Sequence, residues 1–386
     1  MLVALLFVAP AQNLAACGGN FESFLNGLKL EAQQKGYMNA TIERFFSTVE
    51  HDPKTIEADR AQSIFRLPFV DFSARLISKD RIYYGKKNIL KYASLFDQIE
   101  NQFSVPRGIL LAFWAFETDF GKVQGNFNTL NSIVSLAHDC RRPELFRPQV
   151  FAALELYKNG VFEPATTRGA WAGEIGMVQM LPKDILLYGL DGDDDGQVNL
   201  TTSTHDALMS AANLLISLGW RANEPWLQEV TLSNTFDWSL TGLVTEKTGH
   251  EWQNLGVRGL HGQMQSMTLP ASVLLPQGRY GPAFLAYPNF RAVLEWNKSF
   301  VYATTAAYFA TIFHGEPPFK HANPSLGLDI FEMKHLQRKL VSYGYDVGKI
   351  DGILGSKTRT AVQALQKKLG LPADAWPSHE LISLLN

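Results

Sequence analysis

The segment Ile109-Leu110-Leu111-Ala112-Phe113-Trp114-Ala115-Phe116-Glu117 decides how this chain folds. Every residue up to Phe116 is apolar, and a helix that is apolar on all sides lies in the centre of a domain. Ser104, before Pro106, predicts the start of this helix, since a serine hydroxyl caps the first backbone N–H groups. Glu117 closes the helix, so we expect its carboxylate at the rim of a poorly solvated site.

A carboxyl group in such a place suits proton transfer. Loss of solvation disfavours the charged form and raises the carboxyl pKa, as a general acid near neutral pH requires. The alternative is that Glu117 ends its helix facing water. The nearest second carboxylate, Asp119, would point away, because side chains on one helix face are three or four positions apart. The segment therefore offers Glu117 as a candidate general acid, and Glu174 is a second carboxylate that could approach it through folding.

The composition limits the classes of protein that the chain can belong to. Of 386 residues, 46% are hydrophobic and 19% charged, which predicts a large core in two or three domains. The 35 lysines and arginines against 37 acidic residues give a net charge of −2. This balance argues against bulk binding of nucleic acid, which needs a positive surface. No apolar run reaches the ~18 residues of a membrane-spanning helix.

The first residues indicate export. Residues 1–10 are apolar except for the final proline, and small residues follow, which predicts a signal segment over 1–17 and a periplasmic protein. Ordinary cleavage fits Ala9-Pro10-Ala11. Leu14-Ala15-Ala16-Cys17 resembles a bacterial lipobox, which would anchor the protein in the outer membrane through a lipid on Cys17. A disulfide between Cys17 and Cys140 is the second use of this thiol, and two free thiols are the third.

The remaining chain divides into two parts. Apolar residues at helical spacing run from Phe21 to Phe103 and from Glu295 to Phe313, whereas residues 230–290 predict loops with a few strands. We therefore expect one mainly helical domain over 18–313. Three prolines and two glycines between His314 and Gly327 indicate a linker over 314–328. Two amphipathic helical segments around a turn-rich connector predict a compact domain over 329–386.

An acidic loop predicts a cation site. Residues 191–199 read DGDDDGQVN, which has the spacing of an EF-hand loop with oxygen ligands on a tight glycine turn. Thr202 stands where the closing glutamate is usual, and Asp206 could close a longer loop. The alternative is an acidic surface turn. The predicted ligands of a structural calcium ion are Asp191, Asp193, Asp195, Gln197 and Asp206.

Several motifs together resemble the membrane-bound lytic murein transglycosylase B family. They are Glu117–Gly121 with Asn126–Asn131, Gly173–Pro182, and Ala286–Phe290 with Glu295–Ser299 and Tyr302. The resemblance implies a lysozyme-like core with helical and small mixed α/β subdomains. Residues 329–386 resemble a three-helix peptidoglycan-binding domain through Leu336–Leu340, Gly344-Tyr345, Ile350–Gly355 and Gly370–Pro372.

The resemblance also implies roles for individual residues. Glu117 becomes the single catalytic acid and base, and the family has a comparable calcium loop but needs no cofactor for its chemistry. Two departures from the family pattern are Trp296, which replaces a tyrosine, and Ala170, which replaces a serine. The residues that match substrate-binding positions are Phe120, Met177, Gln179, Trp296, Asn297 and Tyr302, with the two aromatic residues of the last motif expected to stack on sugars.

The implied reaction cleaves the β-1,4 bond between N-acetylmuramic acid and N-acetylglucosamine in peptidoglycan. The muramyl 6-hydroxyl attacks its own anomeric carbon and leaves a 1,6-anhydromuramyl end, so neither water nor a second carboxylate is needed. A hydrolytic muramidase on the same fold and a non-catalytic peptidoglycan-binding scaffold are the alternatives. We expect a monomer whose partner is the glycan strand.

Overall fold

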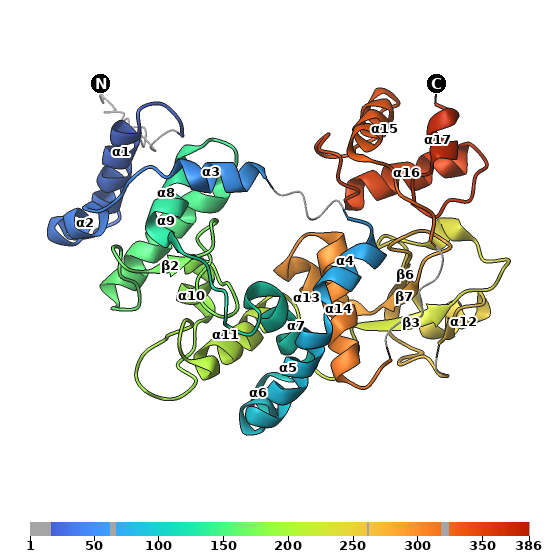
Figure 1. Cartoon of the computed structure of the whole chain (residues 1–386), viewed down its shortest axis with the longest axis horizontal. Helices are drawn as coiled ribbons and strands as arrows, with labels where there is room; N and C mark the ends of the chain where they lie inside the picture. The colour runs from blue at the N-terminus through green and yellow to red at the C-terminus, as the bar shows by residue number, and fades with distance from the viewer. Residues whose placement is uncertain (1–16, 62–66, 261, 318–323, 386) are drawn as a thin grey trace, which may run out of the picture. The chain divides into compact units, whose positions relative to one another are not determined.

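The computed structural model describes residues 17–61, 67–260, 262–317 and 324–385, and these are mostly helical (Figure 1). The mainly helical class is therefore confirmed. The predicted signal segment lies outside the described residues apart from Cys17. The chain forms two compact units, which are residues 1–61 with 123–207 (unit 1) and residues 62–122 with 208–386 (unit 2). Among the described residues, no helix combines the length and apolar character that crossing a membrane requires.

Unit 1 is built on two buried helices that pack together, α8 and α9. Its helices are α1 (Phe21–Gln34), α2 (Asn39–Phe46), α3 (Pro53–Arg60), α8 (Thr129–His138), α9 (Pro143–Lys158) and α10 (Pro182–Tyr188). A small antiparallel sheet pairs β1 (Phe127–Asn128) with β2 (Arg168–Gly169). Helix α11 (Thr204–Ser217) begins in unit 1 and ends in unit 2.

A disulfide joins Cys17 to Cys140, with their Cα atoms 5.0 Å apart. Next to it, the backbone N–H of Gly18 donates to the carbonyl of His138 at 2.7 Å. The bond therefore ties the start of the described chain to the end of α8. Of the three predicted uses of Cys17, the structure has the disulfide. A lipid on Cys17 would need the same sulfur atom, so the lipidated form is incompatible with this structure.

The helical part of unit 2 surrounds α7 (Arg107–Thr118), whose residues 108–115 are all buried. Helices α5 (Lys79–Lys91), α6 (Ala93–Phe103) and α14 (Phe300–Phe313) pack on α7, and α4 (Phe69–Leu76) and α13 (Pro288–Trp296) pack on α14. The predicted central helix is thus confirmed, but its predicted cap is wrong. Ser104 ends α6 with φ 52°, and the Glu100 carboxylate accepts the Arg107 backbone N–H at 2.8 Å instead.

A five-stranded antiparallel sheet forms the second part of unit 2, as the β-prone runs of residues 230–290 indicated. Its strand order is β4 (Lys247–Thr248), β6 (Pro270–Leu274), β7 (Ala283–Ala286), β3 (Leu227–Thr231) and β5 (Arg258–Gly259). Helix α12 (Gly249–Asn254) and the 3-10 turn η2 (Trp238–Leu240) accompany it. The indole of Trp252 is fully buried and donates to the carbonyl of Ala271 at 2.8 Å, which pins α12 to β6.

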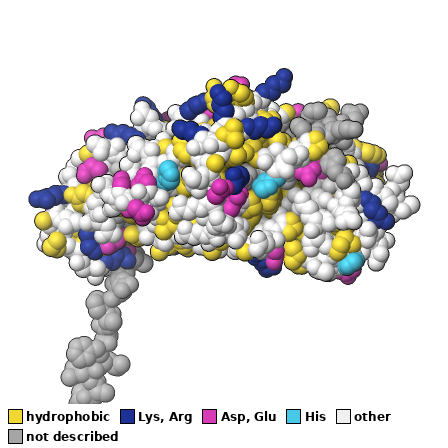
Figure 2. Space-filling model, turned by 90° about the horizontal axis from the view of Figure 1, so that it is seen from below, with side chains coloured by type: hydrophobic (Ala, Val, Ile, Leu, Met, Phe, Trp, Pro, Cys, Tyr) yellow, Lys and Arg dark blue, Asp and Glu magenta, His cyan; other side chains and the backbone are white. Residues whose placement is uncertain are grey.

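The last part of unit 2 consists of three helices, as predicted for the C-terminal domain. They are α15 (Ile330–Ser342), α16 (Ser356–Lys368) and α17 (His379–Ser383), around a shared apolar core. Asp329 and Glu332 form a capping box that starts α15. Figure 2 shows acidic, basic and hydrophobic side chains intermixed on one face of the molecule, which agrees with the nearly balanced composition.

Arg359 of α16 connects the three-helix domain to the sheet. Its guanidinium donates to the carbonyl of Leu275 at 3.3 Å and to that of Pro276. It also lies 4.7 Å from the centre of the Phe300 ring and 5.8 Å from that of Trp376. Burial lowers the pKa of Arg359 to about 9, so the group remains charged at neutral pH. A charged donor thus satisfies two carbonyls that close the hairpin after β6.

We predict that Arg359→Ala lowers the free energy of unfolding by about 1–3 kcal/mol, because it leaves those carbonyls without their donor. Thermal unfolding measures the change. Arg338→Ala, an exposed arginine of α15, is the matched control and should unfold like the unaltered protein. Equal melting temperatures for both variants would show that the Arg359 contacts contribute nothing to stability.

Candidate active site

Glu117 stands in the last turn of α7, directly before a backbone reversal. Asp119, Phe120 and Gly121 have φ values of 52°, 61° and 85°. Two of these three are non-glycine residues in the left-handed region, a strained conformation that concentrates at functional sites. The Thr118 hydroxyl accepts the Gly121 backbone N–H at 2.9 Å and so holds the turn. The chain therefore fixes where the carboxyl group of Glu117 emerges.

Two donors hold one oxygen of this carboxyl group. The Tyr302 hydroxyl donates to Oε1 of Glu117, and the Trp296 indole N–H donates to the same Oε1 at 3.2 Å. Among the described residues, Oε2 has no hydrogen-bond partner. A protonated carboxyl has one carbonyl oxygen that accepts and one hydroxyl that donates. Both donors therefore define Oε1 as the carbonyl oxygen and leave the proton on Oε2.

The electrostatics of the site favour that protonated form. Burial raises the pKa of Glu117, and the hydrogen bonds from Tyr302 and Trp296 oppose the rise without cancelling it. Burial, and then the charge of Glu117, raise the pKa of Tyr302 well above its usual value. Tyr302 therefore keeps its proton and stays a donor at neutral pH.

The sequence did not predict which aromatic rings Trp296 and Tyr302 pack against. Trp296 stacks on Phe113 with ring centres 4.3 Å apart and planes 10° from parallel. Tyr302 is only 6% exposed and meets Phe116 edge-on at 5.9 Å. The motif predicted both residues but assigned them to sugar stacking, which stays a prediction. No local sequence signal could reveal hydrogen bonds that span 179 and 185 residues.

Asp119 is engaged elsewhere, although it lies in the left-handed turn after α7 and not on the helix, where it was expected. Its Oδ1 accepts from Nε of Arg81 at 3.2 Å. Arg81 belongs to α5, and no motif had singled it out. This ion pair fastens the turn after α7 to α5, so the carboxylate nearest to Glu117 in sequence has a structural partner.

The other predicted residues of unit 2 lie near the end of α7 and the junction of α13 with α14. The ring of Phe120 meets Trp114 edge-on at 5.5 Å. Asn297 lies between α13 and α14, and its Oδ1 accepts the backbone N–H of Ser299 at 3.0 Å. Glu117, Phe120, Trp296, Asn297 and Tyr302 thus come from the end of α7 and the junction of α13 with α14.

Met177 and Gln179 belong to unit 1, where they share one tight turn between Ile175 and Met180. Gln179 has φ 53°, and its Nε2 donates to the carbonyl of Gly176 at 2.8 Å and to that of Gln124 at 3.2 Å. These bonds fix the amide. They support a defined position for the Gln179 side chain, and its contact with substrate stays a prediction.

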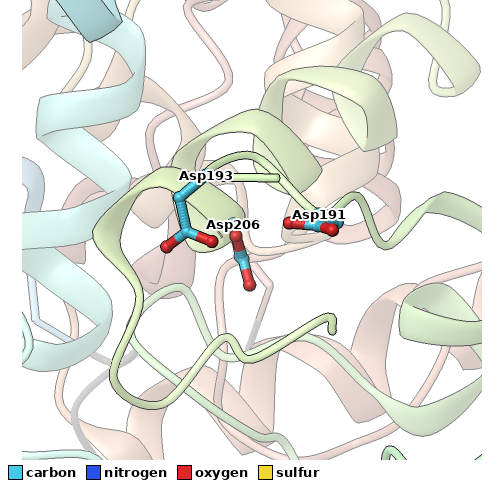
Figure 3. Close-up of side chains that lie close together, drawn as sticks. All are labelled: Asp191, Asp193 and Asp206. Carbon is cyan, nitrogen blue, oxygen red and sulfur yellow. The ribbon is translucent and has the colours of Figure 1, made fainter. Parts of the chain in front are cut away.

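The acidic loop gathers three of its predicted ligands. Oxygen atoms of Asp191, Asp193 and Asp206 all lie within 4.8 Å of one another (Figure 3). Asp206 is fully buried and accepts the backbone N–H groups of Gly192 at 2.8 Å and Asn199 at 2.6 Å. Asp206 thus lies beside the loop, and its part as the closing cation ligand stays a prediction.

Asp195 and Gln197 have a local contact. The Oδ1 of Asp195 accepts the backbone N–H of Gln197 at 2.8 Å, and Asp195 is not one of the three gathered carboxylates. Three carboxylates with oxygen atoms in this arrangement suit a hard divalent cation. The part that Asp195 and Gln197 play in holding one stays a prediction.

Known protein families match both parts of the chain. Residues 20–311 match the family described as Transglycosylase SLT domain. Residues 332–384 match the family described as a peptidoglycan binding domain. The chain is also 26% identical over 319 residues to membrane-bound lytic murein transglycosylase B of Escherichia coli (strain K12). The alignment covers 76% of this chain and 84% of that protein.

Solved structures agree with the fold. The crystal structure of SltB3 from Pseudomonas aeruginosa in complex with NAG-anhNAM-pentapeptide is 35% identical, with a TM-score of 0.87 over 95% of this chain and all of that one. Escherichia coli Slt35 in complex with calcium is 20% identical, with a TM-score of 0.64 over 80% of this chain and all of that one. The second likeness shows a shared fold.

We predict that Tyr302→Phe raises the pKa of Glu117 further, because it removes a donor that stabilises the carboxylate. Carboxyl carbon NMR of the labelled glutamates, with Glu117→Gln to assign the signal, measures the midpoint. Tyr280→Phe, an exposed tyrosine of the hairpin before β7, is the control. A midpoint that stays or falls in Tyr302→Phe would show that the hydroxyl does not stabilise the charge.

Proposed function

The chain belongs to the transglycosylase SLT family, and from that membership we propose that it cleaves the β-1,4 bond between N-acetylmuramic acid and N-acetylglucosamine with Glu117 as its only acid and base. The homologous lytic transglycosylases are peptidoglycan-cleaving enzymes of the lyase type. The proposal adds the bond, the product and the residue that carries the proton.

The observation that supports the proposal most is the shared use of Oε1 by Tyr302 and Trp296. With the carbonyl oxygen held by two donors, the proton on Oε2 is presented to the leaving glycosidic oxygen. A proton donor with a raised pKa is effective near neutral pH. Because the pKa of Glu117 is raised, the rate should fall as the pH rises through that pKa and the acid ionises.

The second half of the reaction returns the proton. The bond from the anomeric carbon to the glycosidic oxygen breaks, and the muramyl 6-hydroxyl oxygen forms a new bond to that carbon. Glu117 takes the proton that the 6-hydroxyl loses. Ordinary glycosidases need a second carboxylate for a nucleophile or a water, but an internal hydroxyl has a high effective concentration without one. The pairing of Asp119 with Arg81 supports this simpler mechanism.

The disulfide supports export. A bond between Cys17 and Cys140 persists in oxidising compartments and is rare in the cytosol. We therefore propose that the enzyme works in the periplasm, where peptidoglycan lies.

A calcium ion would stabilise the structure without taking part in the reaction. Asp191, Asp193 and Asp206 would supply carboxylate oxygens, and Asp195 and Gln197 are the further predicted ligands. A relative of the same fold is described in complex with calcium. The ion would fix the loop between α10 and α11.

Calcium should raise the melting temperature, and a free concentration 100 times the dissociation constant should add about 2.7 kcal/mol of stability. Asp193→Asn should abolish this shift, whereas the neighbouring Asp194→Asn, outside the carboxylate group, should preserve it. Thermal unfolding with and without millimolar calcium distinguishes them. An unchanged melting temperature in the unaltered protein would identify the loop as an acidic turn.

Glu117→Gln should preserve the shape of the site but remove the proton, so we expect release of fragments from purified peptidoglycan to fall by about 100-fold or more. Binding to the insoluble polymer should persist. The matched control is Glu295→Gln, an exposed glutamate of α13, which should cleave normally.

Mass spectrometry of the fragments completes this test. Fragments one water lighter than hydrolysis products are expected from the unaltered enzyme and from Glu295→Gln. Fragments with the added water would favour the hydrolytic muramidase. Undiminished cleavage by Glu117→Gln would refute the role of Glu117, and no cleavage by the unaltered protein would favour the binding scaffold.

A further inference from the structure

Helix α5 concentrates positive charge on a chain that is slightly negative overall. Its thirteen residues, KDRIYYGKKNILK, include five lysines and arginines and one aspartate, whereas the whole chain has a net charge of −2. Lys122, beyond the end of α7, adds one more cation beside this helix. We name the exposed group of Tyr83, Tyr84, Lys86, Lys87 and Lys122 the α5 patch.

The α5 patch holds aromatic rings and ammonium groups together at the surface. Tyr83 is 53% exposed and Tyr84 42% exposed, and their ring centres are 5.3 Å apart. The ammonium of Lys87 lies 4.7 Å from the centre of the Tyr83 ring, and that of Lys122 lies 4.0 Å from the centre of the Tyr84 ring. Cation–π contact of this kind positions both ammonium groups while solvent still reaches them.

The patch is continuous with the turn that follows Glu117. Arg81 of α5 pairs with Asp119, and Lys122 of the same turn reaches back over Tyr84. Gly85 lies between these contacts, and a side chain there would stand 2.3 Å from the Phe313 ring and 3.5 Å from the Phe120 ring. The absence of a side chain at Gly85 therefore allows α5 to pack closely against α14. The helix that carries the patch is thus closely packed, and Lys122 follows the proposed acid by five positions in the sequence.

We propose that the α5 patch binds the peptide-bearing part of a peptidoglycan strand outside the sugars that are cleaved, with Lys87 and Lys122 holding peptide carboxylates and Tyr83 and Tyr84 contacting the strand. This inference rests on the proposed function of the same site. Muramyl peptides carry free carboxylates, so their charge is opposite to that of the patch. A lysine–carboxylate hydrogen bond is charge-assisted, and tyrosine contributes apolar area with a polar end.

The position of the patch favours this occupant over other anions. A strand held near Glu117 extends beyond the cleaved bond in either direction, and Lys122 joins the patch to the turn that follows Glu117. A duplex nucleic acid requires a wide positive surface, and a net charge of −2 argues against one. An anionic membrane surface remains as an outcome that the experiment must separate.

The test compares two soluble glycan substrates, strands with their peptides and strands stripped of them by an amidase. For the double variant of Lys87→Ala and Lys122→Ala, we expect KM for peptide-bearing strands to rise by roughly 2- to 30-fold, since each of the two exposed ion pairs contributes about 0.2–1 kcal/mol. The stripped strands, which keep only the lactyl carboxylate of each muramyl residue, should show a smaller rise of KM. The effect should shrink at high salt, because exposed charges are screened.

Matched controls show whether charge alone explains the result. Lys54→Ala with Lys158→Ala removes two exposed lysines from unit 1 and should leave KM unchanged for both substrates. The double variant of Tyr83→Ala and Tyr84→Ala should raise KM for both substrates, because sugar and peptide lose the same contact area.

Three results would overturn the proposal. They are an unchanged KM in the lysine variant, an equal rise of KM for both substrates in that variant, and, for either substrate, a changed KM that is fully explained by lost binding to phosphatidylglycerol vesicles. Dissociation constants measured in a Glu117→Gln background keep this test separate from the chemistry. If the unaltered enzyme makes no anhydro product, the proposed function fails, and those dissociation constants still decide the role of the α5 patch.

Discussion

The rest of the site depends on the pair of hydrogen bonds that Tyr302 and Trp296 give to one oxygen of Glu117. They connect the end of α7 with the junction of α13 and α14, elements that lie far apart in the sequence. A carboxyl group at the edge of an apolar helix would otherwise rotate freely and turn both oxygens toward solvent. With Oε1 engaged twice, one oxygen accepts and the other is left to carry and transfer a proton.

Burial and hydrogen bonding act in opposite directions on the pKa of Glu117. Burial raises the pKa of Glu117, while the two donors stabilise its charged form, and burial prevails. The result is a carboxyl that can give up its proton and take it back, which a mechanism with a single acid and base requires. The buried face of α7 against α14 and the strained turn over Asp119 and Phe120 keep the group in this setting.

The sequence predicts well what depends on local pattern. The apolar run predicts α7, the acidic loop predicts the grouping of Asp191 and Asp193, and the ordered motifs predict the family. Prediction from the sequence fails where a contact depends on side chains that are distant in the sequence. Glu100 takes the capping position that Ser104 was expected to fill, Arg81 engages Asp119, and the two donors reach Glu117 across more than 170 residues. The pairing of Cys17 likewise depends on where Cys140 lies, which spacing alone cannot decide.

The central claim is that the sugar's own hydroxyl, rather than water, attacks the carbon that Glu117 helps to release. Digestion of peptidoglycan in water enriched in ¹⁸O, followed by mass spectrometry of the fragments, tests it most directly. The account predicts that the new ends carry no ¹⁸O, because every atom of the new bond comes from the strand itself. Incorporation of one ¹⁸O atom at each new muramyl end would contradict the account and show that water is the nucleophile.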